Sequence, residues 1–300
     1  MNRFLRTLAS VVAVLLMVNL AAPRTVRAET DPRDYEALVA LPSHTALLIA
    51  YYRHITSSDT ENLSENLVLF RTVYTLKLGN ISLVPIDFIL PVADVQVNVT
   101  TGATSSLVLN GSGIGDLIYV PTILYTLPQD KLSYTYFGFS PYFFFPTGNF
   151  DKTKVINIGG NRLAVEPEIM FGQRYQMFNL ELVGNVTLYG DSNDHLNPTT
   201  GTTFNESQDP TFGLAVHATM DISPIVYLGA SYYFFNNGAI KVSGTDVEVT
   251  PSQTVHSARF SWAIRLEKAS LLLLQYNQDF HVTGGASISR WFGARISTFF

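Results

Sequence analysis

The sequence has 300 residues, contains no cysteine and carries 24 acidic against 19 basic residues, for a net charge of −5 at pH 7. This balance argues against a nucleic-acid partner, and without thiols the chain has no disulfides and no thiolate metal site. Only 14% of the residues are charged while 12% are aromatic, and a typical soluble domain carries about 25% charged residues.

The first 28 residues have the parts of a secretory signal peptide. Arg3 and Arg6 form a basic start, an uncharged apolar stretch follows at 8–22, and a small-residue cleavage site ends at Ala28. The apolar stretch is shorter than the ~20 residues that a spanning helix needs. We therefore expect a signal peptide at 1–28, a periplasmic N-terminal segment at 29–43 and a β-barrel at 44–300.

Twelve stretches after residue 43 alternate between apolar and polar residues with the period of two that is typical of strands. Most of them exceed the ~9–11 residues that a tilted strand needs to cross lipid. The predicted strands are 44–55, 65–79, 81–92, 113–126, 131–146, 161–174, 177–190, 209–222, 224–237, 252–267, 269–283 and 286–300.

The connections between these strands alternate in length. Those after even-numbered strands are short, as in "GN" at 79–80, whereas most of those after odd-numbered strands are long and polar, as at 93–112 and 191–208. Bacterial outer-membrane barrels combine short periplasmic turns with long outer loops in this way. The prediction is an all-β, 12-stranded antiparallel transmembrane β-barrel of the bacterial outer-membrane type, with both termini on the periplasmic side.

The two faces of each strand must then point to different surroundings. A charge that faces mid-bilayer lipid costs roughly 2–4 kcal/mol, so the apolar face should point outward and the charged face toward the lumen. In the strand at 161–174, Leu163 and Ile169 alternate with Glu166 and Glu168. The strand at 131–146 is aromatic on both faces, and its orientation stays open.

Several stretches resemble the family described as "Putative MetA-pathway of phenol degradation". They are "DPRDYEALVALPSHTALLIAYYRH" (31–54), "GSGIGDLIYVPTILY" (111–125), "YFGFSPYFFFPTGNFD" (136–151) and "NIGGNRLAVEPEIMF" (157–171). The most specific pattern is Gly115-Asp116 followed by Pro121. The resemblance implies an outer-membrane barrel that passes hydrophobic or aromatic compounds.

The predicted lumen face holds eight acids, eight bases and several aromatic side chains. One interpretation is that opposite charges pair across neighbouring strands and hold the interior together. The other is that some of these side chains line a solute path. The candidate path residues are Tyr51, Arg71, Asp116, Arg162, Glu166, Glu168, Glu181, His217, Tyr227, Tyr233, Arg259, Asp279, Trp291 and Arg295. The long loops, or the segment 29–43, could add a plug.

The function predicted from these features is passive uptake of small hydrophobic or aromatic solutes through the outer membrane, without catalysis. The partners expected are outer-membrane lipid, the solute, and the barrel-assembly machinery, because a terminal aromatic such as Phe300 resembles its recognition signal. One alternative is a cell-surface barrel hydrolase of protease or lipase type, with Asp279 and His281 as an acid–base pair on one face. Another is a structural barrel that conducts nothing.

No cofactor and no metal site are expected. The six histidines are scattered and lack metal-ligand spacing. The "GSGIGD" stretch at 111–116 leads into a strand and not a helix N-terminus, so we interpret its glycines as part of a loop. The acids and amides at 191–209 lack an EF-hand spacing and predict a solvated loop.

Overall fold

The computed structural model describes residues 30–57, 61–100, 106–130, 132–196, 202–267, 269–284 and 288–300. The expected signal peptide at 1–28 therefore lies outside the described residues. No helix among the described residues is long and apolar enough to cross a membrane.

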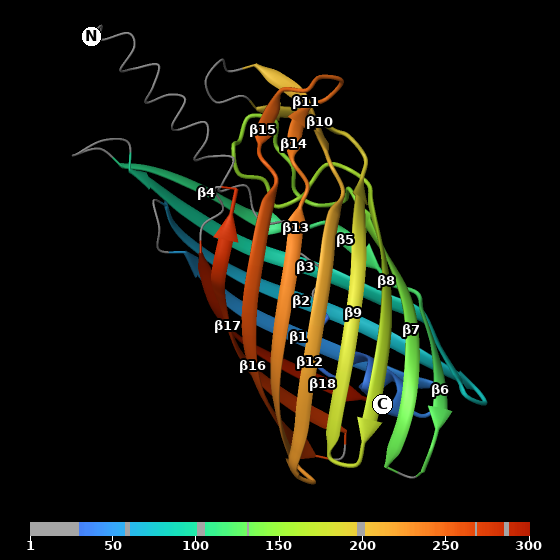
Figure 1. Ribbon diagram of the computed structural model, residues 1–300. Coiled ribbons are helices and arrows are strands. Elements are labelled where there is room, and N and C mark those ends of the chain that lie inside the picture. The colour runs from blue at the N-terminus through green and yellow to red at the C-terminus, as the bar shows by residue number, and fades with distance from the viewer. Residues whose placement is uncertain are drawn as a thin grey trace, which may run out of the picture.

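Strands form a closed cylinder (Figure 1). Its wall consists of β1 (Thr45–Ser57), β2 (Glu61–Leu78), β3 (Ile81–Thr100), β4 (Ser106–Ile114), β5 (Leu117–Tyr119), β6 (Thr122–Pro128), β7 (Ser133–Phe145), β8 (Ala164–Tyr175), β9 (Phe178–Tyr189), β12 (Thr211–Ser223), β13 (Val226–Asn237), β16 (Gln253–Glu267), β17 (Ser270–Thr283) and β18 (Ser289–Phe299).

The fourteen strand segments occupy twelve positions in the wall. The short pieces β4, β5 and β6 follow one another along β3 and together fill one position. All neighbours are antiparallel, and β1 pairs with β18 from Ser57↔Ser289 to Leu47↔Phe299, which closes the cylinder. The predicted 12-stranded antiparallel barrel is confirmed.

The two ends of the cylinder differ, as the loop lengths predicted. At the short-turn end, pairs such as β8 and β9 are joined by two residues, 176–177. At the long-loop end, the loops after β9 and β13 carry a second sheet that the sequence did not predict (Figure 1). This rim sheet consists of β10 (Ser192–Leu196), β11 (Thr203–Gln208), β14 (Ile240–Val242) and β15 (Glu248–Thr250). In outer-membrane barrels these ends face the periplasm and the cell exterior, respectively.

The prediction of one long loop, at 93–112, is wrong. We expected a loop at 93–112, but β3 continues to Thr100 and pairs with β4 from Val92↔Ile114 to Thr100↔Ser106. The stretch "VADVQVNVT" (92–100) keeps the alternation of a strand. Its polar residues therefore belong to the end of a wall strand and not to a loop.

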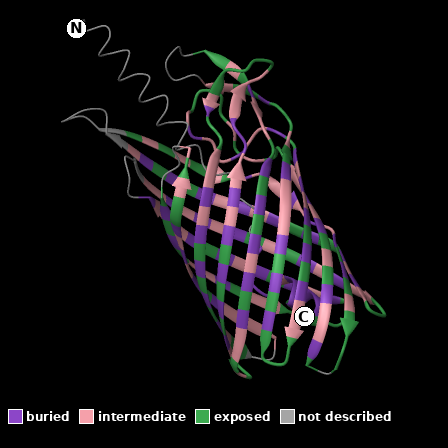
Figure 2. Ribbon diagram, in the orientation of Figure 1, coloured by how far each residue is buried: buried purple, intermediate pink, exposed green. Residues whose placement is uncertain are grey.

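Burial alternates residue by residue along the wall, as Figure 2 shows by its bands. Large apolar side chains point outward, such as Ile169 and Phe260, each 66% exposed, whereas Glu168 and Arg259 inside are each 1% exposed. This arrangement is the inverse of a soluble protein and belongs to a barrel that faces lipid. Strand β7, whose orientation the sequence left open, turns Tyr136 and Tyr142 inward and Phe137 and Phe139 outward.

The described part of the N-terminal segment lies inside the barrel. It contains the helix α2 (Asp34–Ala40), which buries Tyr35, Leu38 and Val39. The chain leaves the lumen at the short-turn end, where the Pro42 carbonyl accepts hydrogen bonds from Thr45 and Thr75, each at 3.0 Å. The sequence predicted a periplasmic segment at 29–43 and also allowed this segment to form a plug. Residues 30–41 lie in the lumen as a plug would, and they are called the plug below.

Candidate functional site

The plug is held to the wall by buried charges, of which Asp31 has the most contacts. One carboxylate oxygen lies 2.8 Å from Nη1 of Arg259 and 3.8 Å from Nη2 of Arg53, and the other lies 3.3 Å from Nη1 of Arg295. Gln275 also donates to Asp31 at 3.0 Å. Burial by itself would raise the pKa of Asp31, but the guanidinium groups of Arg295, Arg259 and Arg53 hold it at about 2. Asp31 therefore stays ionised and compensates a cluster of positive charge.

The next plug residues, Arg33 and Asp34, also form pairs with the wall. The backbone N–H of Arg33 donates to Glu181 at 2.8 Å, and its Nη1 donates to Asp221 at 2.6 Å. Asp34 accepts from Arg295 and lies 3.5 Å from Nη1 of Arg71. The two signs are thus matched across the boundary between plug and wall, as buried charges require.

Two glutamates complete the contacts between plug and wall. Glu36 of α2 accepts from Arg174 at 2.9 Å. Glu168 of β8 accepts from the hydroxyls of Thr30 at 2.7 Å and Tyr35 at 2.5 Å. The plug therefore contacts β8 as well as the strands around β18.

Aromatic and cationic side chains gather in the lumen beside Asp31. The guanidinium carbon of Arg259 lies 4.1 Å from the ring centre of Tyr233 and 4.5 Å from that of Trp291. The guanidinium carbon of Arg53 also lies over Trp291, 4.6 Å from the ring centre, and His217 packs edge-on against Tyr233. Cation–π contacts of this kind hold aromatic rings in place, so these rings have a fixed position on the inner side of the wall.

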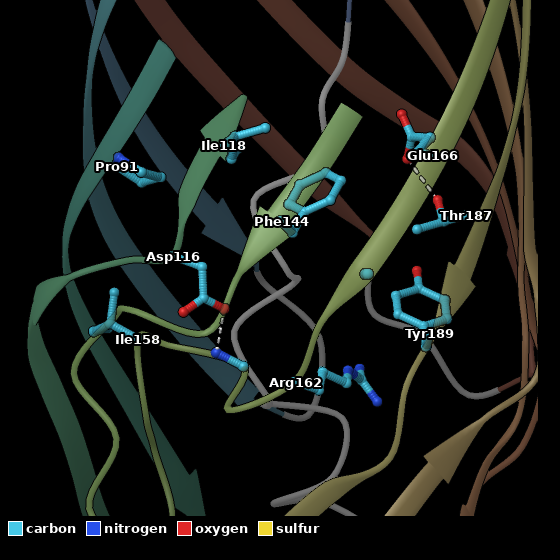
Figure 3. Close-up of a pocket in the computed structure, with 11 residues that line it drawn as sticks. Pro91, Asp116, Ile118, Phe144, Ile158, Arg162, Glu166, Thr187 and Tyr189 are labelled. Atoms are coloured by element: carbon cyan, nitrogen blue, oxygen red, sulfur yellow. Dashed lines mark hydrogen bonds between the residues drawn. The ribbon is translucent and has the colours of Figure 1, made fainter. Parts of the chain in front are cut away.

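Asp116 lies at the long-loop end, in a small pocket of about 60 Å³ that Figure 3 shows. Its carboxylate accepts from the backbone N–H groups of Gly148 at 2.9 Å and Gly160 at 2.8 Å. A Cβ at Gly148 would come within 2.7 Å of the Cα of Gly159, so the backbones approach too closely for a side chain. The most specific part of the family-like pattern thus ties the loop 146–163 to the wall.

The same pocket holds two more of the predicted path residues (Figure 3). Arg162 lies 4.6 Å from the ring centre of Tyr189 and 3.3 Å from Glu206 of the rim sheet. Glu166 accepts from Thr187 at 2.5 Å. These side chains therefore join β8, β9 and the rim sheet.

The structure places the fourteen predicted path residues on the inner side of the barrel, in three groups. The group that lies around the plug consists of Tyr51, Arg71, Glu168, Glu181, His217, Tyr227, Tyr233, Arg259, Trp291 and Arg295. Asp116, Arg162 and Glu166 form the pocket at the long-loop end. Asp279 is separate and accepts from Ser257 at 2.6 Å and Ser289 at 2.7 Å.

The proposed acid–base pair of Asp279 and His281 is wrong. A register shift between β16 and β17 pairs His281 with His256 but Asp279 with Ser257, and these partners are neighbours in sequence. Asp279 therefore points inward, whereas His281 lies on the outer side with its ring centre 5.2 Å from that of His256. The β-bulge breaks the simple alternation on which the pair depended.

The charged plug residues Asp31, Arg33, Asp34 and Glu36 were not among the residues predicted from the sequence. The signal for them was the density of charge in "DPRDYE" (31–36), whose second half begins the helix Asp34–Ala40. Among the described residues, no group of His, Cys, Asp and Glu is arranged to hold a metal ion.

Comparisons with known proteins agree with this architecture. The family model described as "Putative MetA-pathway of phenol degradation" matches residues 55–291. The solved structure of the COG4313 outer membrane channel from Pseudomonas putida F1 is 22% identical, with a TM-score of 0.79 over 91% of this chain and 100% of that one. The transport unit of the autotransporter AIDA-I from Escherichia coli is 7% identical, with a TM-score of 0.55 over 96% and 98% of the two chains. No curated protein matches the sequence.

Proposed function

Since the chain belongs to the family described as "Putative MetA-pathway of phenol degradation", we propose that it is an outer-membrane channel for passive uptake of small hydrophobic or aromatic compounds. The family description points to aromatic solutes, and the inward rings of Tyr233 and Trp291 offer apolar contact along the lumen. The balanced charges inside argue against a strongly ion-selective pore.

The observation that carries this proposal is the way the plug is attached. Within the part of the chain that the structure describes, the backbone–backbone hydrogen bonds of residues 30–41 stay inside the plug, as from Leu41 to Ala37. Where the plug backbone bonds to the wall, as from the N–H of Arg33 to Glu181 and from Tyr233 to the carbonyl of Thr30, the wall partner is a side chain. Its contacts with the wall run through side chains, such as Asp31 to Arg259 and Glu36 to Arg174. A segment attached in this way can leave its place while the backbone ladder of the wall stays intact.

The proposed mechanism has a closed and an open arrangement. With the plug docked, its helix and ion pairs fill the lumen toward the short-turn end. Solute enters from the long-loop end, contacts the aromatic rings beside Asp31 and passes when the plug shifts. Because many of the contacts pair opposite charges of wall and plug, separation exposes ionised groups that water can solvate.

Planar-bilayer conductance of the full-length mature protein tests the channel. We expect small, infrequent openings for the native chain and larger ones when the plug is released by the double substitution Asp31→Asn and Asp34→Asn. In the source bacterium, deletion of the gene should slow uptake of phenol and toluene, and expression in trans should restore it. Absence of conductance in both proteins together with unchanged uptake would favour a non-conducting structural barrel.

Export and assembly are part of the same proposal. We propose that residues 1–28 direct export and are removed after Ala28, and that Phe300 is read by the barrel-assembly machinery. Phe300 is exposed and exchanges backbone hydrogen bonds with Ala46, at 2.8 and 3.2 Å. N-terminal sequencing of the protein from outer membranes tests the first point, and Phe300→Ser tests the second through the amount of assembled barrel.

A further inference from the structure

A cavity of about 330 Å³ lies between α2 and the inner side of β1, β2, β17 and β18. Its size falls within the range of small-molecule pockets, roughly 300–1,000 Å³. Much of its lining is apolar, with Leu38 and Leu41 from the plug facing Leu47, Val73 and Leu271 from the wall. The cavity can therefore accept an apolar body such as a single aromatic ring.

The polar part of the lining includes buried hydrogen-bond donors. Arg33, Tyr227 and Arg295 line the cavity, and each is at most 5% exposed. Nη2 of Arg33, the hydroxyl of Tyr227 and Nε of Arg295 have no hydrogen-bond partner among the described residues. Oε2 of Glu36, which also lines the cavity, has no hydrogen bond in the described part of the chain either, but it lies 3.3 Å from Nε of Arg33 and is compensated by that charge. Buried donors without an acceptor are unfavourable, so the three donors favour an occupant that brings acceptors.

The charges of the lining also favour an occupant that brings acceptors. Four arginines (Arg33, Arg71, Arg265 and Arg295) line the cavity against two carboxylates, Asp34 and Glu36. Arg71 is compensated by Asp87, with nitrogen–oxygen distances of 2.7 and 2.9 Å. Arg33 and Arg295 keep an unused donor although both have carboxylate partners. The site therefore offers donors of positive charge at one side of an apolar space.

We propose that this cavity binds a small amphipathic anion, an aromatic carboxylate, with its ring against the leucines and its carboxylate toward Arg33, Tyr227 and Arg295. The inference rests on the proposed channel function and narrows its solute class. A carboxylate brings two acceptor oxygens to the three donors, and its charge pairs with guanidinium groups. An uncharged ring compound fills the same apolar space but leaves the donors without a charged acceptor.

Calorimetric titration of the full chain in a non-ionic detergent tests the site, with benzoate as the probe and benzyl alcohol as its uncharged counterpart. Titration into detergent alone corrects for partition into micelles. We expect benzoate to bind at least tenfold more tightly than benzyl alcohol. Tyr227→Phe removes one donor and keeps the ring, so it should weaken benzoate several-fold without lowering the melting temperature. Equal affinity for the two probes, or no binding of benzoate, would overturn the proposal.

Filling the cavity provides a second, independent test. Ser297→Phe places a ring in the cavity from β18, where Ser297 lines it, and it should reduce benzoate affinity more than tenfold. Ala294→Phe on the lipid-facing side of the same strand is the matched control and should leave binding unchanged. If Ser297→Phe does not assemble, Leu271→Phe fills the same space from β17. Retained binding in an assembled filled variant would contradict the site.

The two proposals fail in distinguishable ways. If benzoate binds as described but neither conductance nor uptake is found, the binding site stands and the channel function fails. If the channel conducts and aromatic compounds are taken up but benzoate does not bind the cavity, the anion site fails and the channel stands.

Discussion

The two ends of the barrel each hold a segment against the wall, but by different kinds of bond. At the short-turn end, the plug is attached by side-chain contacts such as Asp31 with Arg259. At the long-loop end, the loop 146–163 is attached through backbone groups, with the amides of Gly148 and Gly160 donating to Asp116 and the amide of Asn149 donating to Ile114. Hydrogen bonds of the backbone fix the path of a chain, whereas the ion pairs of the plug can break without a change in the backbone of the wall.

This difference assigns separate roles to the two ends. The loop at the long-loop end is a permanent part of the wall, and the plug is an exchangeable occupant of the lumen. If the plug is exchangeable and the loop is permanent, substitutions at the plug change conductance more than stability. Substitutions at the long-loop end then change stability more than conductance.

The largest effect is expected at Asp31. Asp31→Asn leaves Arg53, Arg259 and Arg295 without their shared carboxylate, and breaking a buried ion pair from one side costs about 3–5 kcal/mol. Docking of the plug should weaken roughly 100-fold or more, because 1.4 kcal/mol corresponds to tenfold. The measurement is open probability in planar bilayers, with heat-modifiable migration in gels as the check that the barrel is assembled.

The control for this change is Asp130→Asn, which alters an exposed carboxylate in the turn between β6 and β7 at the same end of the barrel. Its conductance should equal that of the native protein. An unchanged open probability for Asp31→Asn would remove the distinction between an exchangeable plug and a fixed rim.

A smaller effect is expected where the wall supports the plug. Tyr136 lies over Gly172 on the neighbouring strand, so a Cβ at Gly172 would come within 2.1 Å of the ring. Gly172→Ala therefore displaces Tyr136, whose hydroxyl donates to Glu181 at 2.8 Å, and overpacking of this kind costs about 1–3 kcal/mol. Urea unfolding in detergent measures the loss of stability.

Gly184→Ala is the matched control for that substitution, since an added Cβ there meets no atom within 4 Å. It should unfold like the native protein. If both alanine variants lose the same stability, contact with Tyr136 is not the cause.

At the other end, Asp116→Ala removes the acceptor of two backbone amides, and each buried amide left without an acceptor costs about 1–3 kcal/mol. The loop 146–163 should become accessible to protease while open probability stays close to that of the native channel. Asp151→Ala changes an exposed carboxylate in the same loop and should not increase cleavage. A conductance change as large as that of Asp31→Asn would place the gate at the rim.

The smallest effect on open probability is expected from changes of pH above 4. The pKa of Asp31 in the docked plug is about 2, below its ordinary value of 3.8. A lowered pKa means that the docked state gains stability above pH 3.8 and loses it as the pH falls toward 2. The contribution of Asp31 to docking should therefore be constant between pH 8 and pH 5 and be lost only in strong acid, with a matching rise in open probability. A marked rise near pH 6 would show that a different group holds the plug.

The wall of the barrel follows from the sequence because a strand exposes its two faces alternately. The inward positions of Glu168 and Arg259 could be predicted from parity alone. Parity fails at a bulge, where one extra residue reverses every later side chain, and His281 shows this. The plug could not be placed from the sequence, because the partners of Asp31 are three arginines from β1, β16 and β18, and only the closed barrel brings them together.

The seam between β1 and β18 has a consequence for the order of biogenesis. Phe300 bonds to Ala46, the second residue of β1, and continues the pairing of β1 with β18, so the cylinder cannot close before β18 has been delivered. The plug directly precedes β1 and stays next to that seam until the end. A chain truncated before residue 289 would keep two unpaired strand edges, which lipid cannot solvate, and quality-control proteases would remove it.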